Sequence, residues 1–306
     1  MGRALIVFLS LGGTTSRVAR HIARGLGRAD IDADLCNLSR PVGAATTNSD
    51  LADYDLIGVG SPAHYYRASP PVMRFLRDLP RLEGRGAFTF ILHGTYPGRT
   101  ARDLRVGLEK RGAAHLGAFS SRGADRYVAY MRKGVLFSAG HPDETDLDAA
   151  EAFGEGVGRR WSEHDPKSVP AAPLSPETDV TGIYRLERLL TTPLLARHLY
   201  SRLFRLDGRR CTGCGACARR CPVDNISLGP DRRPRWGREC TLCLYCEMIC
   251  PEEAITTPVD WPPFDSFIAH NVRVAAADPH LDHVQVVHEG GRTRLLADTP
   301  GADSER

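Results

Sequence analysis

Apolar and polar positions alternate along the first half of the chain in blocks that predict strands and helices in turn. Residues 3–9 form a nearly continuous apolar run, which is typical of a strand buried on both faces of a parallel sheet. After the next loop, apolar residues recur at helical spacing from Val18 to Leu26. The same reading predicts strands at 31–38, 55–60, 87–93 and 113–120, and helices at 70–79, 100–111 and 143–161. This alternation predicts a doubly wound α/β domain over residues 1–164, with a five-stranded parallel sheet.

Polar loops follow three of these strands. In a doubly wound sheet, ligands bind beyond the carboxyl ends of the strands, at the topological switch point. The first loop, residues 10–16, joins a buried strand to a helix, so its backbone N–H groups form a phosphate site. The alternative is an ordinary turn capped by Thr14 or Thr15. The loop has neither the lysine of a Walker loop nor the G-x-G-x-x-G spacing of a dinucleotide site.

The second and third loops, 61–66 and 93–98, offer aromatic faces beside polar groups. A phosphate cradle next to such loops suits a phosphorylated planar ring, which indicates flavin mononucleotide (FMN). The ring-lining candidates are His64, Tyr65, Tyr66 and Tyr96, although half-buried core is the simpler reading of Tyr66. The expected FMN-binding residues are Ser10, Gly12, Gly13, Thr14, Thr15, Ser16, Ser61, Pro62, Ala63, His64, Tyr65, Tyr66, His93, Gly94, Thr95, Tyr96 and Gly98.

Eight of the nine cysteines form two copies of one motif, C-x2-C-x2-C-x3-C-P. This spacing binds [4Fe–4S] clusters in bacterial two-cluster ferredoxins, where the fourth cysteine of each run ligates the cluster of the other run. The expected ligands of cluster I are Cys211, Cys214, Cys217 and Cys250, and those of cluster II are Cys240, Cys243, Cys246 and Cys221. The glycines of the first run and the apolar residues of the second predict clusters of different potential.

Zinc sites and disulfides are the alternative uses of so many cysteines. Disulfide frameworks belong to short secreted domains, whereas this chain has 306 residues. Zinc sites take C-x2-C pairs separated by longer gaps. The third cysteine of each run and the proline after the fourth fit neither alternative. The ninth cysteine, Cys36, is expected to be a buried strand residue without a redox role.

Composition and charge limit the remaining functions. The hydrophobic content of 42% suits ordinary cores, and the net charge of +3 is too small to indicate a nucleic-acid partner. No stretch approaches the ~20 apolar residues that span a bilayer. The apolar start of the chain reads as a strand entering a loop rather than a signal peptide, so a reducing, cytoplasmic location is expected.

The other segments connect or extend the two motif-bearing regions. Residues 165–206 read as a proline-rich linker followed by two short amphipathic helices interrupted at Pro193. These helices are expected to pack between domains, although a basic amphipathic stretch can also bind a membrane or a partner. The cluster domain is expected at 207–260. The C-terminal extension at 261–306 is expected to hold a hairpin turning at Gly290-Gly291 and a disordered tail.

Three loops and two cysteine runs carry a family resemblance. Residues 10–15 resemble the flavodoxin phosphate loop Ser/Thr-x-Thr-Gly-x-Thr: Ser10, Gly13 and Thr15 keep the pattern, and Gly12 replaces the first threonine. Residues 58–62 with the following tyrosines resemble the second flavin loop, and residues 93–98 resemble the third. Together with the cysteine runs, residues 3–260 are similar to flavodoxin–ferredoxin fusion proteins. The resemblance implies bound FMN and electron transfer between flavin and clusters.

The expected function is that of a soluble electron-transfer flavoprotein, of oxidoreductase type, that relays electrons between FMN, two [4Fe–4S] clusters and an external redox partner. No acid–base or nucleophile constellation indicates a catalytic residue. One alternative is a ferredoxin-like carrier whose flavodoxin-like domain binds no flavin and acts as a docking scaffold. Another, an iron–sulfur sensor acting on nucleic acid, is disfavoured by the weak net charge.

The expected partner is an unknown redox protein or reductase. Eight arginines between residues 209 and 238 would steer an acidic partner, offset cluster charge, or form a solvated face. Neither nucleic acid nor a transmembrane segment is expected, and the sequence leaves a homodimer open.

Overall fold

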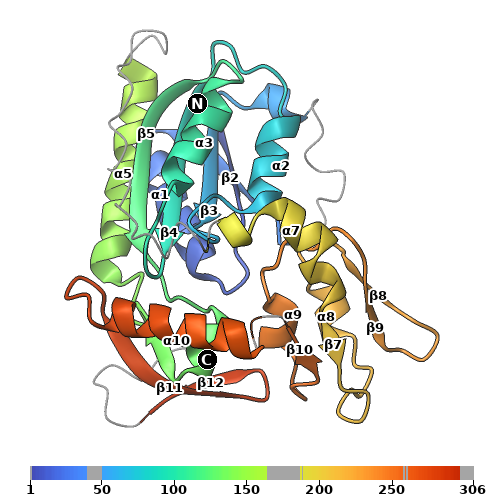
Figure 1. Cartoon of the computed structure of the whole chain (residues 1–306). Coiled ribbons are helices and arrows are strands. Elements are labelled where there is room, and N and C mark those ends of the chain that lie inside the picture. Colours follow the sequence, from blue (N-terminus) through green and yellow to red (C-terminus); the bar gives the residue numbers. More distant parts are fainter. Residues whose placement is uncertain are drawn as a thin grey trace. The chain divides into compact units, whose positions relative to one another are not determined.

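The computed structural model describes residues 2–39, 50–163, 187, 189–257, 259 and 261–296. The chain forms two compact units (Figure 1). The first comprises Met1–Gly123 and His141–Leu186, and the second comprises Ala124–Gly140 and Glu187–Arg306. The second unit thus includes a segment that the sequence assigned to the first domain. The proline-rich stretch expected at 165–181 and the expected C-terminal tail lie outside the described residues.

A five-stranded parallel sheet forms the centre of the first unit (Figure 1). Its strand order is β2-β1-β3-β4-β5, and every neighbouring pair is parallel. The predicted doubly wound fold is therefore confirmed. Each predicted strand matches an observed one to within two residues at either end: β1 (Gly2–Phe8), β2 (Ile31–Asn37), β3 (Leu56–Pro62), β4 (Gly86–His93) and β5 (Ala114–Arg122).

Helices cover both faces of this sheet. Alternate strand residues face opposite layers, so Leu5 and Val7 pack with α2 and α3, whereas Ile6 and Phe8 pack with α1 and α5. The buried faces are apolar on both sides, which is why the strands read as continuous apolar runs. The helices are α1 (Thr14–Arg28), α2 (Pro70–Asp78), α3 (Thr100–Glu109) and α5 (Glu144–Glu163), with a short 3-10 helix η1 (Asp50–Asp53).

Glycines allow α1 and α5 to pack closely. A Cβ atom added to Gly25 would lie 1.9 Å from the carbonyl oxygen of Glu151. One added to Gly154 would lie 2.2 Å from the carbonyl oxygen of Ile22. Any larger residue at either position would therefore force the two backbones apart.

The second unit contains the cysteine runs and small antiparallel sheets. Strand β7 (Arg205–Leu206) pairs with β10 (Ile255–Thr256), and β8 (Ile226–Leu228) pairs with β9 (Pro234–Trp236). A four-residue helix carries the third cysteine of each run, Cys217 in the first and Cys246 in the second. The described helices of this unit include α4 (Val128–Arg132), α7 (Pro193–His198), η2 (Tyr200–Arg202), α8 (Ala216–Arg219), α9 (Tyr245–Met248) and α10 (Pro262–Ala276).

A three-stranded sheet joins distant parts of the chain within the second unit. Strands β11 (His283–Glu289) and β12 (Arg292–Leu295) form the predicted hairpin around Gly290-Gly291, which is confirmed. The third strand, β6 (Val135–Phe137), pairs with β11 and comes from the segment between β5 and α5. Its three residues are too few for periodicity to predict, because the strand exists only through this long-range pairing.

Of the two amphipathic helices expected at 183–206, the structure describes α7, in which Pro193 opens the first turn. Thr192 caps this helix, since its side chain accepts a hydrogen bond from the backbone N–H of Leu195 at 3.3 Å. Among the described residues, no helix is both long enough and apolar enough to cross a bilayer.

Gly25 and Gly27, two residues apart on α1, provide a matched test of the α1–α5 packing. We expect Gly25→Ala to lower the free energy of unfolding by about 1–3 kcal/mol, because its methyl group meets backbone. Gly27→Ala should raise it by about 0.5–1 kcal/mol, since a Cβ there meets nothing within 4 Å and the unfolded chain loses entropy. Urea unfolding followed by far-UV circular dichroism measures both. Equal effects would contradict the close approach.

Candidate cofactor sites

The three polar loops predicted from the sequence meet at one edge of the sheet. Strands β1, β3 and β4 are adjacent and parallel, so the loops after their carboxyl ends are neighbours. The chain order reverses at β1, which has β2 on one side and β3 on the other. The crevice of a doubly wound sheet lies at this switch point. The expected FMN-binding residues all lie at or beside this edge.

The first loop is held by the side chain of Ser10. This residue is only 6% exposed, and its Oγ accepts the backbone N–H of Ser16 at 3.2 Å. Asn37, at the end of β2, fixes Ser10 by accepting its N–H at 2.9 Å and donating to its carbonyl at 3.1 Å. The N-cap residue of α1 is Gly13, which has no side chain to cap the helix, so the alternative of a turn capped by a threonine is not observed.

The N-terminus of α1 fits a phosphate group. Its N-cap is Gly13, which has a left-handed backbone with φ of 93°, and a Cβ atom there would meet nothing within 4 Å. No acidic residue lies in the first turn, so the positive end of the helix dipole keeps its charge. Gly12 and Gly13 are exposed. This open, exposed backbone leaves room for an anion to approach the N–H groups at the start of the helix.

The second loop places two tyrosines in a strained turn. His64 and Arg67 exchange backbone hydrogen bonds of 2.8 and 3.3 Å, and the residues between them, Tyr65 and Tyr66, have φ of 50° and 62°. Positive φ at both central positions is the pattern of a type I′ turn, which normally takes Gly or Asn. For bulky residues it costs roughly 1–2 kcal/mol each. Strain of this kind is common at ligand-binding loops.

The two tyrosines of this turn have different surroundings. Tyr66 is 6% exposed and its carbonyl accepts the N–H of Arg99 at 2.9 Å. Gly98 approaches it so closely that a Cβ atom would lie 2.4 Å from that carbonyl oxygen. Tyr66 therefore links the second and third loops, as expected of a core residue. Tyr65 is half-buried and meets the His64 ring edge-on, with 4.7 Å between ring centroids.

His93 and Ser61 shape the loops through their backbone contacts. His93 Nδ1 lies 2.9 Å from the carbonyl oxygen of Thr95, so Nδ1 donates and carries the proton. Burial lowers the pKa of His93, and the neutral ring keeps Nε2 as an acceptor. The fully buried Ser61 hydroxyl donates to the Pro62 carbonyl at 2.8 Å and accepts the N–H of Ser69 at 2.9 Å. Ser61 thus holds the end of β3.

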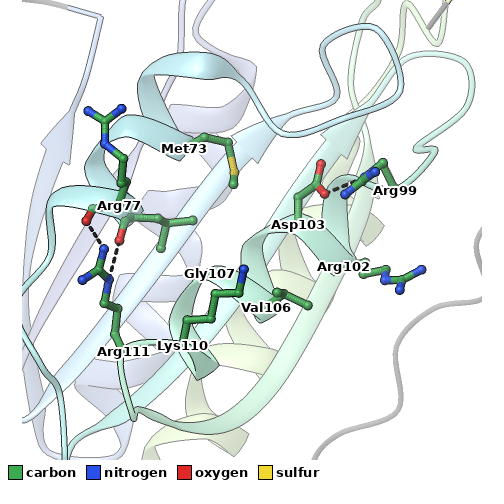
Figure 2. A pocket seen from close by; sticks show the side chains of 10 residues that line it. Met73, Arg77, Arg99, Arg102, Asp103, Val106, Gly107, Lys110 and Arg111 are labelled. Carbon is green, nitrogen blue, oxygen red and sulfur yellow. Dashed lines mark hydrogen bonds and ion pairs between the residues drawn. The ribbon is translucent and has the colours of Figure 1, made fainter. Parts of the chain in front are cut away.

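A basic groove of about 370 Å³ lies between α2 and α3 of the first unit (Figure 2). Asp103 connects it to residues that directly follow the second and third loops, because its carboxylate accepts Arg99 Nε at 2.6 Å and the N–H of Ala68 at 3.3 Å. Arg111 Nε donates to the Leu76 carbonyl at 3.1 Å and so caps the end of α2. The groove is lined by Met73, Leu76, Arg77, Arg99, Arg102, Asp103, Val106, Gly107, Lys110 and Arg111.

The two cysteine runs of the second unit have the same backbone conformation. Gly213 and Gly215 have φ of 67° and 73°, and the matching residues of the second run, Leu242 and Leu244, have φ of 58° and 55°. Left-handed residues at both positions curl each loop inward. Leucine is strained there, whereas glycine is not. Both leucines are buried, so the second loop has a more apolar surrounding than the first.

The cysteine thiols gather in two groups that mix the runs. One pocket is lined by Cys211, Cys214, Cys217 and Cys250, among other residues. Burial raises the pKa of Cys217, and Cys250 and Cys214 raise it further. Burial also raises the pKa of Cys240 to about 12 and that of Cys243 to about 11, with Cys221 adding to each. Each group therefore combines three cysteines of one run with the last cysteine of the other.

Backbone amides point at the thiols in a repeated pattern. The N–H of Asn225 lies 3.3 Å from Cys221 Sγ, and the N–H of Ala254 lies 3.4 Å from Cys250 Sγ. Each donor is four residues after its cysteine. Such donors stabilise a thiolate, and four soft thiolates are the ligand set of an iron–sulfur cluster. The donor chemistry of both groups thus fits [4Fe–4S] clusters, which would bind with release of the thiol protons.

Exposed arginines hold the first cysteine loop from outside. Arg219 Nη1 donates to the Cys214 carbonyl at 2.8 Å, and Arg232 Nε donates to the Gly213 carbonyl at 3.4 Å. These contacts give part of the arginine-rich face a structural role. The guanidinium charges would offset negative charge on a cluster bound by this loop.

The C-terminal hairpin packs against the second cysteine run, which the sequence did not indicate. The N–H of Gly290 donates to Glu253 Oε1 at 2.9 Å. A Cβ atom on Gly291 would lie 3.0 Å from the carbonyl oxygen of Cys250. The segment containing β6 contributes Arg132, whose Nη1 lies 2.9 Å from Glu247 Oε1. No local pattern could have revealed this pair, because its partners are far apart in the sequence.

Comparison with known proteins separates the same two regions. A family model for a flavodoxin domain matches residues 5–139, and a model for a 4Fe-4S dicluster domain matches residues 203–255. No curated protein sequence matches the chain.

Solved flavodoxin structures resemble about half of the chain. A flavodoxin from the domain Archaea is 17% identical, with a TM-score of 0.40, and the match covers 52% of this chain and 99% of that one. For the two-electron reduced flavodoxin of Megasphaera elsdenii the values are 21%, 0.39, 51% and 98%. Rubredoxin oxygen:oxidoreductase from Desulfovibrio gigas is 17% identical, with a TM-score of 0.42, and the match covers 53% of this chain and 36% of that one.

Both domain types serve electron transport, and the parallel sheet and the doubled cysteine motif agree with the two matched regions. The chain is a flavodoxin domain followed by a 4Fe-4S dicluster domain, which is the organisation of a flavodoxin–ferredoxin fusion.

Proposed function

We propose that this protein binds FMN at the three loops of the first unit and two [4Fe–4S] clusters at the cysteine runs, and relays electrons between them and an external redox partner. The observation that carries the proposal is the gathering of eight thiols into two mixed groups of four. When bound, FMN exchanges electrons in pairs or singly, whereas each cluster carries one. A chain that holds both would convert between two-electron and one-electron chemistry.

The residues of the first unit would bind and orient the flavin. The N–H groups at the start of α1 would hold its phosphate, with Ser10 keeping the loop in place. His64, Tyr65 and Tyr96 are half-buried and would line the ring. The neutral His93 ring, oriented by the Thr95 carbonyl, would offer Nε2 as an acceptor at the same edge.

The cysteines of the second unit would each ligate one iron. Cluster I would take Cys211, Cys214, Cys217 and Cys250, and cluster II would take Cys240, Cys243, Cys246 and Cys221. The first cysteine loop contains glycines where the second contains buried leucines. We therefore propose that the two clusters have different reduction potentials. An EPR-monitored titration that found one shared midpoint would argue against this difference.

A ferredoxin-like carrier without flavin is the second candidate, favoured by the missing hydroxyl at Gly12. Iron, sulfide and released FMN per chain, measured after anaerobic purification, separate the two. About eight irons with one FMN support the relay, whereas eight irons without FMN, even after FMN is added, leave the carrier. Zinc in place of iron would overturn both.

Paired cysteine substitutions test which thiols share a cluster. In the proposed ligation, Cys214 and Cys250 serve one cluster, so Cys214→Ala with Cys250→Ala should leave about four of eight irons. Cys214→Ala with Cys221→Ala, both in the first run, should remove both clusters. If each run instead held its own cluster, the two results would be exchanged. Cys36→Ala is the control and should keep all the iron.

The basic groove between α2 and α3 is the surface that we propose for an acidic redox partner. Its cationic side chains point in different directions (Figure 2), and its lining also includes the apolar side chains of Met73 and Val106. Divergent charges suit the broad face of a protein better than a single phosphate. Through Asp103 and Arg99, one end adjoins the loops that would hold the flavin.

Charge reversal in this groove should slow electron transfer from an acidic donor. With a reduced, acidic ferredoxin as the probe, we expect Arg102→Glu with Lys110→Glu to lower the rate of flavin reduction about tenfold at low ionic strength, and the difference should shrink as salt is added. Arg24→Glu with Arg159→Glu makes the same charge change on exposed positions of α1 and α5. An equal loss in that control would rule out the groove. Dithionite should reduce all variants alike.

A further inference from the structure

A buried carboxylate lies within the second cysteine run. Glu247 directly follows Cys246 in α9, and its side chain is 1% exposed. Under the proposed ligation, Cys246 serves one cluster, and Cys250, three residues after Glu247, serves the other. Glu247 also adds to the rise in the pKa of Cys246, after burial and the neighbouring thiols, which places its charge near that thiol. A buried carboxylate requires a counter-charge.

The counter-charge comes from a residue that lies far from Glu247 in the sequence. Arg132, the last residue of α4, places Nη1 2.9 Å from Glu247 Oε1 and is itself 31% exposed. It lies in the segment between β5 and α5, inside the stretch that the flavodoxin model matches. An arginine encoded with the flavodoxin domain thus pairs with an acid beside the cluster ligands.

The C-terminal hairpin holds this arginine in place. Thr293 Oγ1 donates to Sδ of Met131, the residue before Arg132, at 3.4 Å. The N–H of Val286 in β11 donates to the Gly134 carbonyl at 2.9 Å, and β11 continues the sheet with β6. The turn of the same hairpin contacts Cys250, as described above. The hairpin therefore fixes both sides of the ion pair: α4, which bears Arg132, and the run that bears Glu247.

We propose that the Arg132–Glu247 ion pair sets the reduction potential of the clusters, with Glu247 lowering it and Arg132 raising it, and that the C-terminal hairpin exists to hold this pair. The inference rests on the proposed two-cluster function. An added electron makes a cluster more negative, so a nearby carboxylate opposes reduction and a nearby guanidinium favours it. The pair keeps the two influences nearly balanced. Neutralising one partner removes its influence on the clusters while the charge of the other remains, in a region of low dielectric constant.

EPR-monitored redox titration of the full-length protein with its clusters tests this at pH 8. Glu247→Gln should raise the midpoint potential of at least one cluster by about 59 mV, a tenfold change in a one-electron equilibrium. Arg132→Gln should lower it by a similar amount. The double variant should return close to the original potential, and Arg132→Lys should stay close to it, because the charge remains. Shifts of opposite sign are the key result, since a packing defect that merely admitted water would move both single variants in the same direction.

Two controls separate this inference from the function on which it rests. Glu289→Gln with Arg294→Gln removes an exposed pair on the same hairpin, 3.8 Å apart, and should leave the potentials unchanged. If the unmodified protein carries no iron–sulfur clusters, the proposed function fails. If it carries them and Glu247→Gln and the double variant keep the original potentials, only the role of the ion pair fails. Should Arg132→Gln not assemble clusters, the comparison of Glu247→Gln with the double variant and Arg132→Lys still decides.

Discussion

Parallel pairing of β1 with the strands on both its sides is the constraint on which the first unit depends. A parallel sheet that is buried on both faces satisfies its backbone groups only within the ladder, so every connection must cross by a helix and every loop that leaves a carboxyl end opens at the same edge. Because β2 lies on one side of β1 and β3 on the other, the connections that follow β1 and β2 run in opposite directions. Helix α1, which follows β1, therefore covers one face, whereas Leu51 of η1, which follows β2, packs on the other face. The strand order alone therefore places the loops that follow Phe8, Pro62 and His93 next to one another, at the same edge of the sheet.

Strained backbone conformations occur in the candidate cofactor sites of both units. Tyr65 and Tyr66 adopt backbone conformations that glycine or asparagine would adopt more easily, and so do Leu242 and Leu244. In the tyrosine turn, the burial of Tyr66 and its contact with Gly98 stabilise the conformation. In the second cysteine run, the two leucines are buried, and the loop keeps the curl that glycines give the first run. The leucine side chains, which stand where the first run has glycines, make the surroundings of the thiols in the second run more apolar.

The second unit is built from segments that the sequence keeps far apart. Strand β6 and Arg132 precede the cysteine runs by more than seventy residues, whereas β11 and β12 follow them. The three-stranded sheet brings these segments to the second run, where Glu247 and Cys250 lie. A domain boundary drawn from sequence motifs alone separates β6 and Arg132 from the cysteine runs, which belong to the same unit. The motifs identify ligands and loops, but not the helices and strands that support them.

The sequence by itself determined the features that depend on local periodicity or spacing. Such features are the apolar runs of β1 and β3, the helical spacing from Val18 to Leu26 and the repeated C-x2-C-x2-C-x3-C-P. Each can be predicted from a few neighbouring residues, because burial of both sheet faces and cluster ligation impose patterns on adjacent positions. Only the tertiary structure decided the rest. It showed that Ser61 holds its own loop, that Tyr66 links two loops through Gly98 and Arg99, that three residues at Val135 form a strand, and that Arg132 pairs with Glu247. These features depend on contacts between residues that are distant in sequence, and such contacts produce no periodic pattern or fixed spacing from which they could be predicted.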